Sequence, residues 1–188
     1  MKSFTLDWNC ALAVEAGEEQ GAFVRRLVEL HRRGLADVAI TTVSASESLK
    51  GSKKFPASAA QFRKRITNLG WDDLRLLLGP AVVGLTYLNM CKNVGETFDS
   101  ERQAIWQALA PSVDRRLPDG IEDQELWSPK LRKWRNVWCD THTLWTHIDS
   151  GRDVFVTTNT KDFHANHEKL KLLGLRDVAT PEVAVDLV

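Results

Sequence analysis

The residues of this chain best suited to chemistry are four carboxylates that follow or flank short runs typical of β-strands. They come from remote parts of the sequence and are Asp7, Glu47, Asp140 and Asp162. Like charges repel, so a fold that gathers several carboxylates needs a compensating cation. A hard divalent ion such as Mg²⁺ or Mn²⁺ suits this role because it prefers oxygen ligands. Such a centre is suited to hydrolysis of a phosphodiester bond.

Three segments predicted to be strands would bring these acids to one place. They are residues 3–7, Asp37 to Val43, and Asp153 to Thr158. In an open α/β sheet, ligands bind beyond the carboxyl ends of the strands. We therefore expect Asp7 and Asp162 at that edge, with Glu47 in the first turn of a following helix.

Two helices are predicted from apolar residues at helical spacing. The first runs from about Glu18 to Arg33, with acids in its first turn and Gly34 able to close it. The second runs from Leu131 to about Asp149, and Asp140 falls at the edge of its apolar stripe. Alternating strands and helices favour a parallel sheet with right-handed crossovers.

The remaining predictions are shorter. A basic loop covers Lys50 to Pro56, and residues 111–130 read as a second loop. Helices are expected at Ala57 to Asn68, Leu74 to Leu78, Glu101 to Leu109 and His164 to Leu173, and a last strand at Asp177 to Thr180.

Length and composition fit one folded domain spanning residues 1–188. Hydrophobic residues make up 43% of the chain and charged residues 27%, and the formal net charge is +0. No apolar run approaches the length of a membrane span. A membrane is therefore not expected as a partner. Three widely separated cysteines favour a reduced, cytoplasmic protein.

The four acids lie in motifs that resemble those of the PIN-like domain family. The resemblance is carried, in chain order, by Phe4 to Asn9 with its Asp-x-Asn pattern, Thr41 to Glu47, Asp140, the turn Thr157 to Phe163, and Leu173 to Glu182. It covers residues 1–50 and 131–188, whereas residues 51–130 match poorly. Thr160 stands where the family's turn usually places its fourth acid, and Asp162 is the next candidate. Trp8 replaces the small residue usual beside the first acid.

The resemblance implies a fold and an activity. The fold would be a three-layer α/β/α sandwich with a central, mostly parallel sheet and a helical insertion in the middle. The activity would be that of a Mg²⁺- or Mn²⁺-dependent ribonuclease, with Asp7, Glu47, Asp140 and Asp162 as catalytic and metal-binding residues. The family also implies an antitoxin or other regulatory protein as a partner, and a homodimer.

Other residues would support this centre. The polar side chains expected to hold the acids in place are Asn9, Thr158, Asn159 and Thr160. The side chains expected to contact RNA phosphates are Lys50, Lys53, Lys54, Arg63, Lys64 and Arg65.

Alternative interpretations also fit these residues. Each acid taken alone could be a helix cap or a first-turn acid. The Thr160 departure leaves open a catalytically weak PIN-like module that binds RNA or regulates. A phosphatase of the haloacid-dehalogenase type also begins with a strand-end Asp, but Asn9 stands where its second acid belongs. His164-x-x-His167 has no matching ligand pair at zinc spacing.

Overall fold

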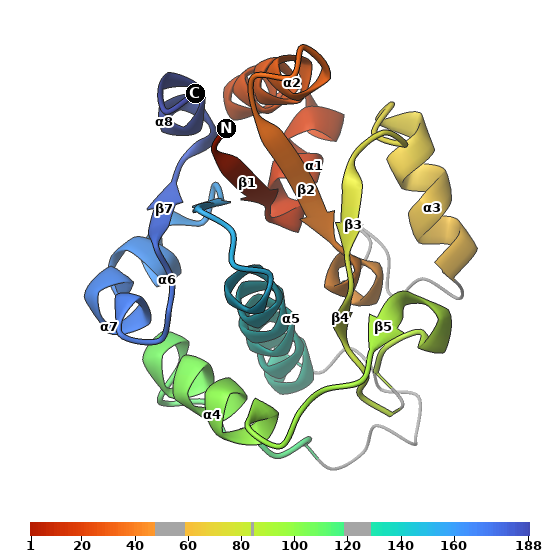
Figure 1. Cartoon of the computed structure of the whole chain (residues 1–188). Helices are drawn as coiled ribbons and strands as arrows, with labels where there is room; N and C mark the ends of the chain where they lie inside the picture. The colour runs from red at the N-terminus through yellow and green to blue at the C-terminus, as the bar shows by residue number, and fades with distance from the viewer. Residues whose placement is uncertain (48–58, 84, 119–128) are drawn as a thin grey trace.

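The core of the protein is a five-stranded, entirely parallel sheet. The computed structural model describes residues 1–47, 59–83, 85–118 and 129–188, and for Leu88 and Thr160 it describes the backbone alone. The strand order is β3-β2-β1-β6-β7 (Figure 1). The bounds are β1 Ser3–Leu6, β2 Asp37–Thr41, β3 Arg75–Leu77, β6 Val154–Val156 and β7 Asp177–Ala179. Two short strands, β4 (Gly79–Pro80) and β5 (Cys91–Lys92), pair separately.

Helices lie against both faces of the sheet. One side carries α1 (Trp8–Ala16), α2 (Glu19–Arg32), α3 (Ala59–Asn68) and α8 (Pro181–Asp186). The other carries α4 (Phe98–Leu109), α5 (Pro129–Asp149), α6 (Thr160–His164) and α7 (His167–Lys171). The 3-10 turns η1 (Thr42–Ser46) and η2 (Leu88–Met90) complete the described elements. Figure 1 shows α1 and α2 together beside β1 and β2, and α4 alongside α5. This arrangement is a mixed α/β fold compatible with an α/β sandwich.

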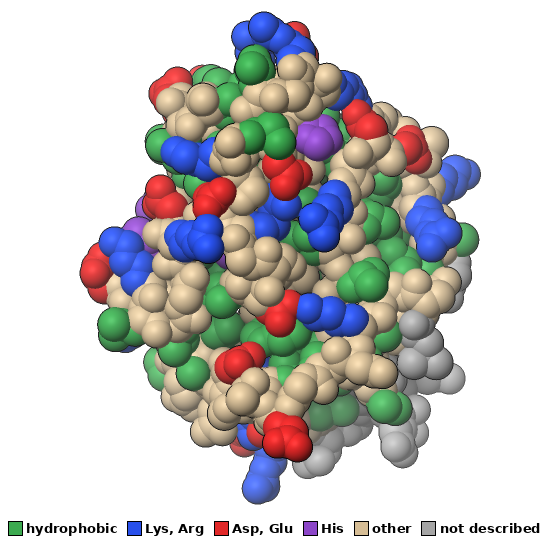
Figure 2. All heavy atoms as spheres, viewed as in Figure 1, with side chains coloured by type: hydrophobic (Ala, Val, Ile, Leu, Met, Phe, Trp, Pro, Cys, Tyr) green, Lys and Arg blue, Asp and Glu red, His purple; other side chains and the backbone are tan. Residues whose placement is uncertain are grey.

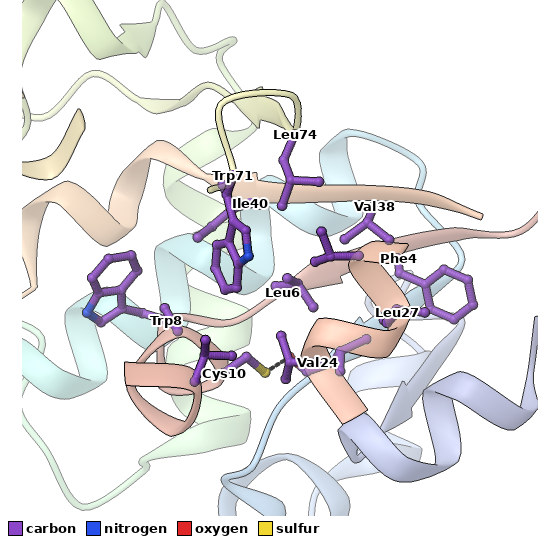
Figure 3. Packing of buried hydrophobic residues seen from close by; sticks show 14 of the residues in the cluster. Phe4, Leu6, Trp8, Cys10, Val24, Leu27, Val38, Ile40, Trp71 and Leu74 are labelled. Carbon is purple, nitrogen blue, oxygen red and sulfur yellow. Dashed lines mark hydrogen bonds between the residues drawn. The ribbon is translucent and has the colours of Figure 1, made fainter. Parts of the chain in front are cut away.

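The two faces arise from the alternation of side chains along each strand. Val154 and Val156 of β6 pack into the cluster below α1 and α2, whereas Phe155 between them packs with α4 and α5. In Figure 3, Leu6 of β1 lies between Ile40 of β2 and Val24 of α2. Because both faces are covered, most residues of β1, β2 and β6 are buried, as is usual for strands of a covered parallel sheet.

Most of the expected elements are confirmed. The structure contains the helix predicted from Glu18 to Arg33 and the long one predicted from Leu131 to Asp149. The tryptophans of the latter are buried, as their helical spacing predicts. Among helices of the described ranges, none combines the length and the apolar composition needed to cross a bilayer.

Three expectations about the elements are wrong. Leu74 to Leu78 was expected to be helical, yet Arg75–Leu77 is β3, because pairing with β2 outweighs local propensity in so short a segment. The middle of the chain therefore adds an edge strand as well as helices. Helix α1 was not predicted, because most of its own residues are small or apolar and its sequence therefore shows little helical periodicity. The helix predicted at His164 to Leu173 is instead divided between α6 and α7.

A close helix contact generates the first prediction. A Cβ atom at Gly21 of α2 would meet the carbonyl oxygen of Ala13 and approach Val14 Cα to 2.9 Å, both in the backbone of α1. Gly21→Ala should therefore lower the free energy of unfolding by about 1–3 kcal/mol, measured by urea denaturation. The control is Gly95→Ala, whose Cβ would meet no atom within 4 Å. Equal stability of the two variants would contradict this packing.

Candidate functional site

Asp7 occupies the junction between β1 and α1. The register of the sheet places Leu6 opposite both Ile40 and Val156, so the central strands end close together. The Asp7 amide donates to the carbonyl oxygen of Val156 at 2.9 Å and thereby continues the ladder by one bond. Its carboxylate caps α1, with Oδ1 accepting from the Trp8 amide at 2.8 Å.

A polar network fixes the other oxygen of the Asp7 carboxylate. Oδ2 accepts from Asn9 Nδ2 at 2.7 Å and from the Thr157 hydroxyl at 2.8 Å. The Thr157 oxygen in turn accepts from Asn9 Nδ2 at 2.9 Å and from the Asn159 amide at 3.0 Å. A carboxylate offers about four lone-pair positions, of which three are used here. About one is left to face a cation or water.

Glu47 enters the site from the segment after β2. The chain leaves β2 through η1, and Glu47 follows in an extended conformation (φ −80°, ψ 152°) rather than in the expected first turn of a helix. The preceding residue is anchored on two sides. The Ser46 hydroxyl donates to the carbonyl oxygen of Leu85 at 2.8 Å, and the guanidinium of Arg135 donates to the Ser46 carbonyl.

Asp140 of α5 completes a pocket of about 350 Å³ at the carboxyl edge of β1. The pocket is lined by Asp7, Asn9, Leu12, Glu47, Arg135, Asn136, Cys139, Asp140 and Asn159. Three of the four acids singled out in the sequence therefore share one cavity. Asp7 is only 4% exposed, whereas Glu47 and Asp140 are half-buried.

Negative charge is crowded in this pocket. Burial raises the pKa of Asp7 to about 6, although its hydrogen bonds from Thr157, Trp8 and Asn9 oppose the shift. Loss of contact with water raises the pKa of Glu47 well above its usual range, and the charges of Asp7 and Asp140 raise it further. The pKa of Asp140 is raised by the same loss of water and by the charges of Asp7 and Asp162.

Two arginines near Glu47 offset part of this charge. Both Arg65 and Arg135 lower the pKa of Glu47. Arg65 is held away from the cavity by its ion pair with Glu15 at 2.5 Å and by the ring of Trp8, 4.5 Å below its guanidinium carbon. Arg135 lines the cavity itself, and its burial lowers its own pKa.

The fourth acid lies beside this pocket rather than in it. Asp162 is exposed in α6, and its Oδ2 accepts from Asn159 Nδ2 at 2.8 Å. It lines a neighbouring cavity together with Asp140. Thr160 begins α6, and its side chain is outside the description.

The threonine whose side chain holds Asp7 in place is Thr157, whereas the sequence pattern had indicated Thr158. Thr158 contributes its backbone amide, which donates to Asn9 Oδ1 at 3.1 Å. A signal was present, because Thr157 follows β6 as directly as Asp7 follows β1. Asn136 was also missed, although it precedes Asp140 by four residues and so shares its helix face.

The residues expected to contact phosphates fall into two groups. Lys50, Lys53 and Lys54 lie outside the described residues. Arg63 and Lys64 are exposed on α3, whereas Arg65 is half-buried in the contacts with Glu15 and Trp8.

The donor set of the acid pocket suits a hard divalent cation, because its carboxylates and amides offer oxygen ligands and repel one another without a counter-ion. Within residues 1–47, 59–83, 85–118 and 129–188, no group of three or more His, Cys, Asp or Glu side chains is already arranged around a metal position. His142 and His147 are buried in α5, and burial lowers the pKa of each to about 3.

Comparison of the chain with protein-family models, curated proteins and solved structures gave no match.

The crowding of charge predicts a pH-dependent gain in stability when Glu47 is neutralised. A group whose pKa is raised by folding stabilises the folded protein while it is protonated, at pH values below its ordinary pKa. This stabilisation is lost as the pH rises through the raised pKa. Glu47→Gln should therefore gain free energy of unfolding relative to the parent protein as the pH rises above the ordinary pKa of a glutamate, because the glutamine carries no charge for Asp7 and Asp140 to repel. The measurement is chemical denaturation in EDTA at several pH values.

The matched control is Glu96→Gln, which removes an exposed carboxylate away from the pocket. Its difference from the parent protein should stay nearly constant over the same range. If Glu47→Gln behaves in the same way as this control, the carboxylates do not repel one another as described.

Proposed function

We propose that this chain is a divalent-metal-dependent ribonuclease of the PIN-like type. The observation that carries the proposal is the convergence of Asp7, Glu47 and Asp140 on one pocket, from β1, the segment after η1, and α5. The charge of Asp7 raises the pKa of Glu47 and that of Asp140, so binding a cation there would relieve repulsion. The same residues carry the resemblance found in the sequence.

Asp7, Glu47 and Asp140 would hold Mg²⁺ or Mn²⁺, in part through water because these side chains are not pre-arranged as direct ligands. When bound, such an ion supplies an acidified water and stabilises charge on the phosphoryl oxygens and the leaving oxygen. In the reaction, a water oxygen bonds to phosphorus, the bond from phosphorus to the leaving oxygen breaks, and that oxygen gains a proton.

The protein's own groups orient the reactants. Asp7 is immobilised by three hydrogen bonds, so its free lone pair keeps one direction. Arg135 lies in the pocket wall, where its guanidinium charge offsets part of that of Glu47 and of an entering phosphate. The amides of Asn136 and Asn159 line the same cavity and offer donors to non-bridging phosphate oxygens.

A second candidate is a PIN-like module that binds RNA or regulates with little catalysis. It is favoured by the position of Asp162, which leaves three acids in the pocket instead of four. An antitoxin-type inhibitor and a homodimer are further parts of the first proposal, and the family resemblance alone supports them.

The direct test of the proposal is loss of cleavage in Asp7→Asn. This variant should cleave RNA in Mn²⁺ at less than about one hundredth of the parental rate, because it loses a charge that no neighbour replaces. The control Asp186→Asn, an exposed acid of α8, should cleave normally. Equal cleavage by Asp7→Asn and the parent protein would rule out this site.

Calorimetric titration with Mn²⁺ separates the two candidates. A nuclease should bind the ion with heat that Asp7→Asn lacks. If the protein is instead an RNA-binding module, it should bind RNA but show neither heat of Mn²⁺ binding nor Mn²⁺-dependent cleavage.

The Thr157 hydroxyl should matter through the orientation of Asp7. Thr157→Val keeps the shape of the side chain but removes the donor to Oδ2, so cleavage should fall by about 10–100-fold. The control is Thr158→Val, which removes the neighbouring hydroxyl. A larger loss in Thr158→Val than in Thr157→Val would contradict the hydrogen-bond network.

A further inference from the structure

The acid pocket opens into a longer groove along α5. A second cavity of about 390 Å³ shares Asn136, Asp140 and Asn159 with the acid pocket. A third cavity of about 490 Å³ shares Ser112, Val113 and Lys133 with the second. The three cavities therefore adjoin one another along α5, and together they are called the groove.

The two walls of this groove come from α5 and from the segment that follows α4. Lys130, Lys133, Asn136 and Asp140 repeat at intervals of three or four residues and so form a stripe along α5. The facing wall is residues 109–118.

The facing wall is fixed to both neighbouring helices. Trp106 Nε1 of α4 donates to the carbonyl oxygen of Val113 at 2.8 Å, and Trp134 Nε1 of α5 donates to that of Arg115 at 3.2 Å. Both indole rings are buried and lie 6.0 Å apart. The groove is thus a built feature of the fold, and these rings are not available to stack on a base.

Charge changes sign along the groove. The end at Asp140 is acidic, whereas the far end is lined by Arg116, Lys130 and Lys133, whose side chains are exposed. Within the described part of the chain, these three cations form no ion pair. Among the described residues that line that cavity, the only acid is Asp114, which accepts a hydrogen bond from the Arg116 amide at 2.9 Å.

This positive end is local. The whole chain has a formal net charge of +0, and acidic and basic side chains are interspersed on the face seen in Figure 2. The protein as a whole is therefore not expected to attract polyanions, and binding would depend on the positive end of the groove.

We propose that this groove binds a single strand of nucleic acid, with Arg116, Lys130 and Lys133 holding a backbone phosphate remote from the cleaved bond. The inference rests on the proposed function and adds the form of its substrate. Asp140 and Lys130 are ten residues apart on α5, which corresponds to roughly 15 Å along the helix. The strand therefore spans several nucleotides between the two ends.

The shape of the site favours a single strand over a duplex. Asp7 is nearly inaccessible at the base of its pocket, and walls rise on both sides of the path that leads to it. A flexible strand can bend into such a recess, whereas a stiff duplex lies across its rim. Binding through phosphates gives affinity with little sequence choice.

The test is binding in the absence of cleavage. A fluorescein-labelled single-stranded oligouridylate is titrated with protein in EDTA, and anisotropy is followed at several salt concentrations. The double variant Lys130→Gln/Lys133→Gln should bind about tenfold more weakly. Its slope of log Kd against log salt should become shallower by about 0.7, because the two lysines hold one phosphate and roughly 0.7 is lost per phosphate contact.

The matched control is Lys2→Gln/Lys169→Gln, which removes the same charge outside the groove. Lys2 precedes β1, at the opposite edge of the sheet from Asp7, and Lys169 is exposed on α7. This control should bind as the parent protein does. Equal weakening in the two double variants, or tighter parental binding to a duplex than to a single strand, would overturn the groove.

Cleavage in Mn²⁺ distinguishes failure of the groove from failure of the nuclease. If oligonucleotide binding depends on Lys130 and Lys133 but the parent protein cleaves nothing, the proposed groove is supported and the proposed nuclease activity is contradicted. If the parent protein cleaves and the Lys130→Gln/Lys133→Gln variant binds and cleaves equally well, the proposed groove is contradicted and the proposed nuclease activity is supported. Parallel titrations with oligouridylate and oligodeoxythymidylate show whether the strand is RNA or DNA.

Discussion

The central constraint on this structure is that the fold holds carboxylates close together although their charges repel one another. Asp7 alone is nearly removed from water, and its three hydrogen bonds prevent it from turning away from Glu47 and Asp140. These bonds come from α1 and from the end of β6, so the parallel register of β1 with β6 is a condition for the pocket. A protein gains no stability from such an arrangement without a cation or a proton to neutralise it. The proposed divalent cation would neutralise this unfavourable charge.

The sheet and its long helices could be predicted from the sequence because their signals are local. Asp37–Thr41 is rich in β-branched residues, and the tryptophans of α5 repeat at helical spacing. The strand-end rule also identified Asp7 as a site residue. By contrast, Arg75–Leu77 becomes a strand through pairing with β2, a contact between residues far apart in sequence. Short segments of this kind carry too little periodicity to be assigned alone.

The convergence of three acids on one pocket was predicted more successfully than the residues around them. Asp140 was identified by its place at the edge of an apolar stripe, and the structure puts it in the pocket. Thr157, Arg135 and the wall formed by residues 109–118 depend on distances between remote elements, which sequence spacing does not encode. The preference for Thr158 over Thr157 shows how an error of one residue exchanges a side-chain contact for a backbone one.

The central claim is that Asp7, Glu47 and Asp140 together bind one divalent cation. The most direct measurement is anomalous diffraction from crystals of the protein soaked in Mn²⁺, recorded on both sides of the manganese absorption edge. An anomalous peak is expected within the pocket bounded by these three carboxylates, with direct or water-mediated contacts to each. Manganese peaks elsewhere on the protein, with none in this pocket, would contradict it.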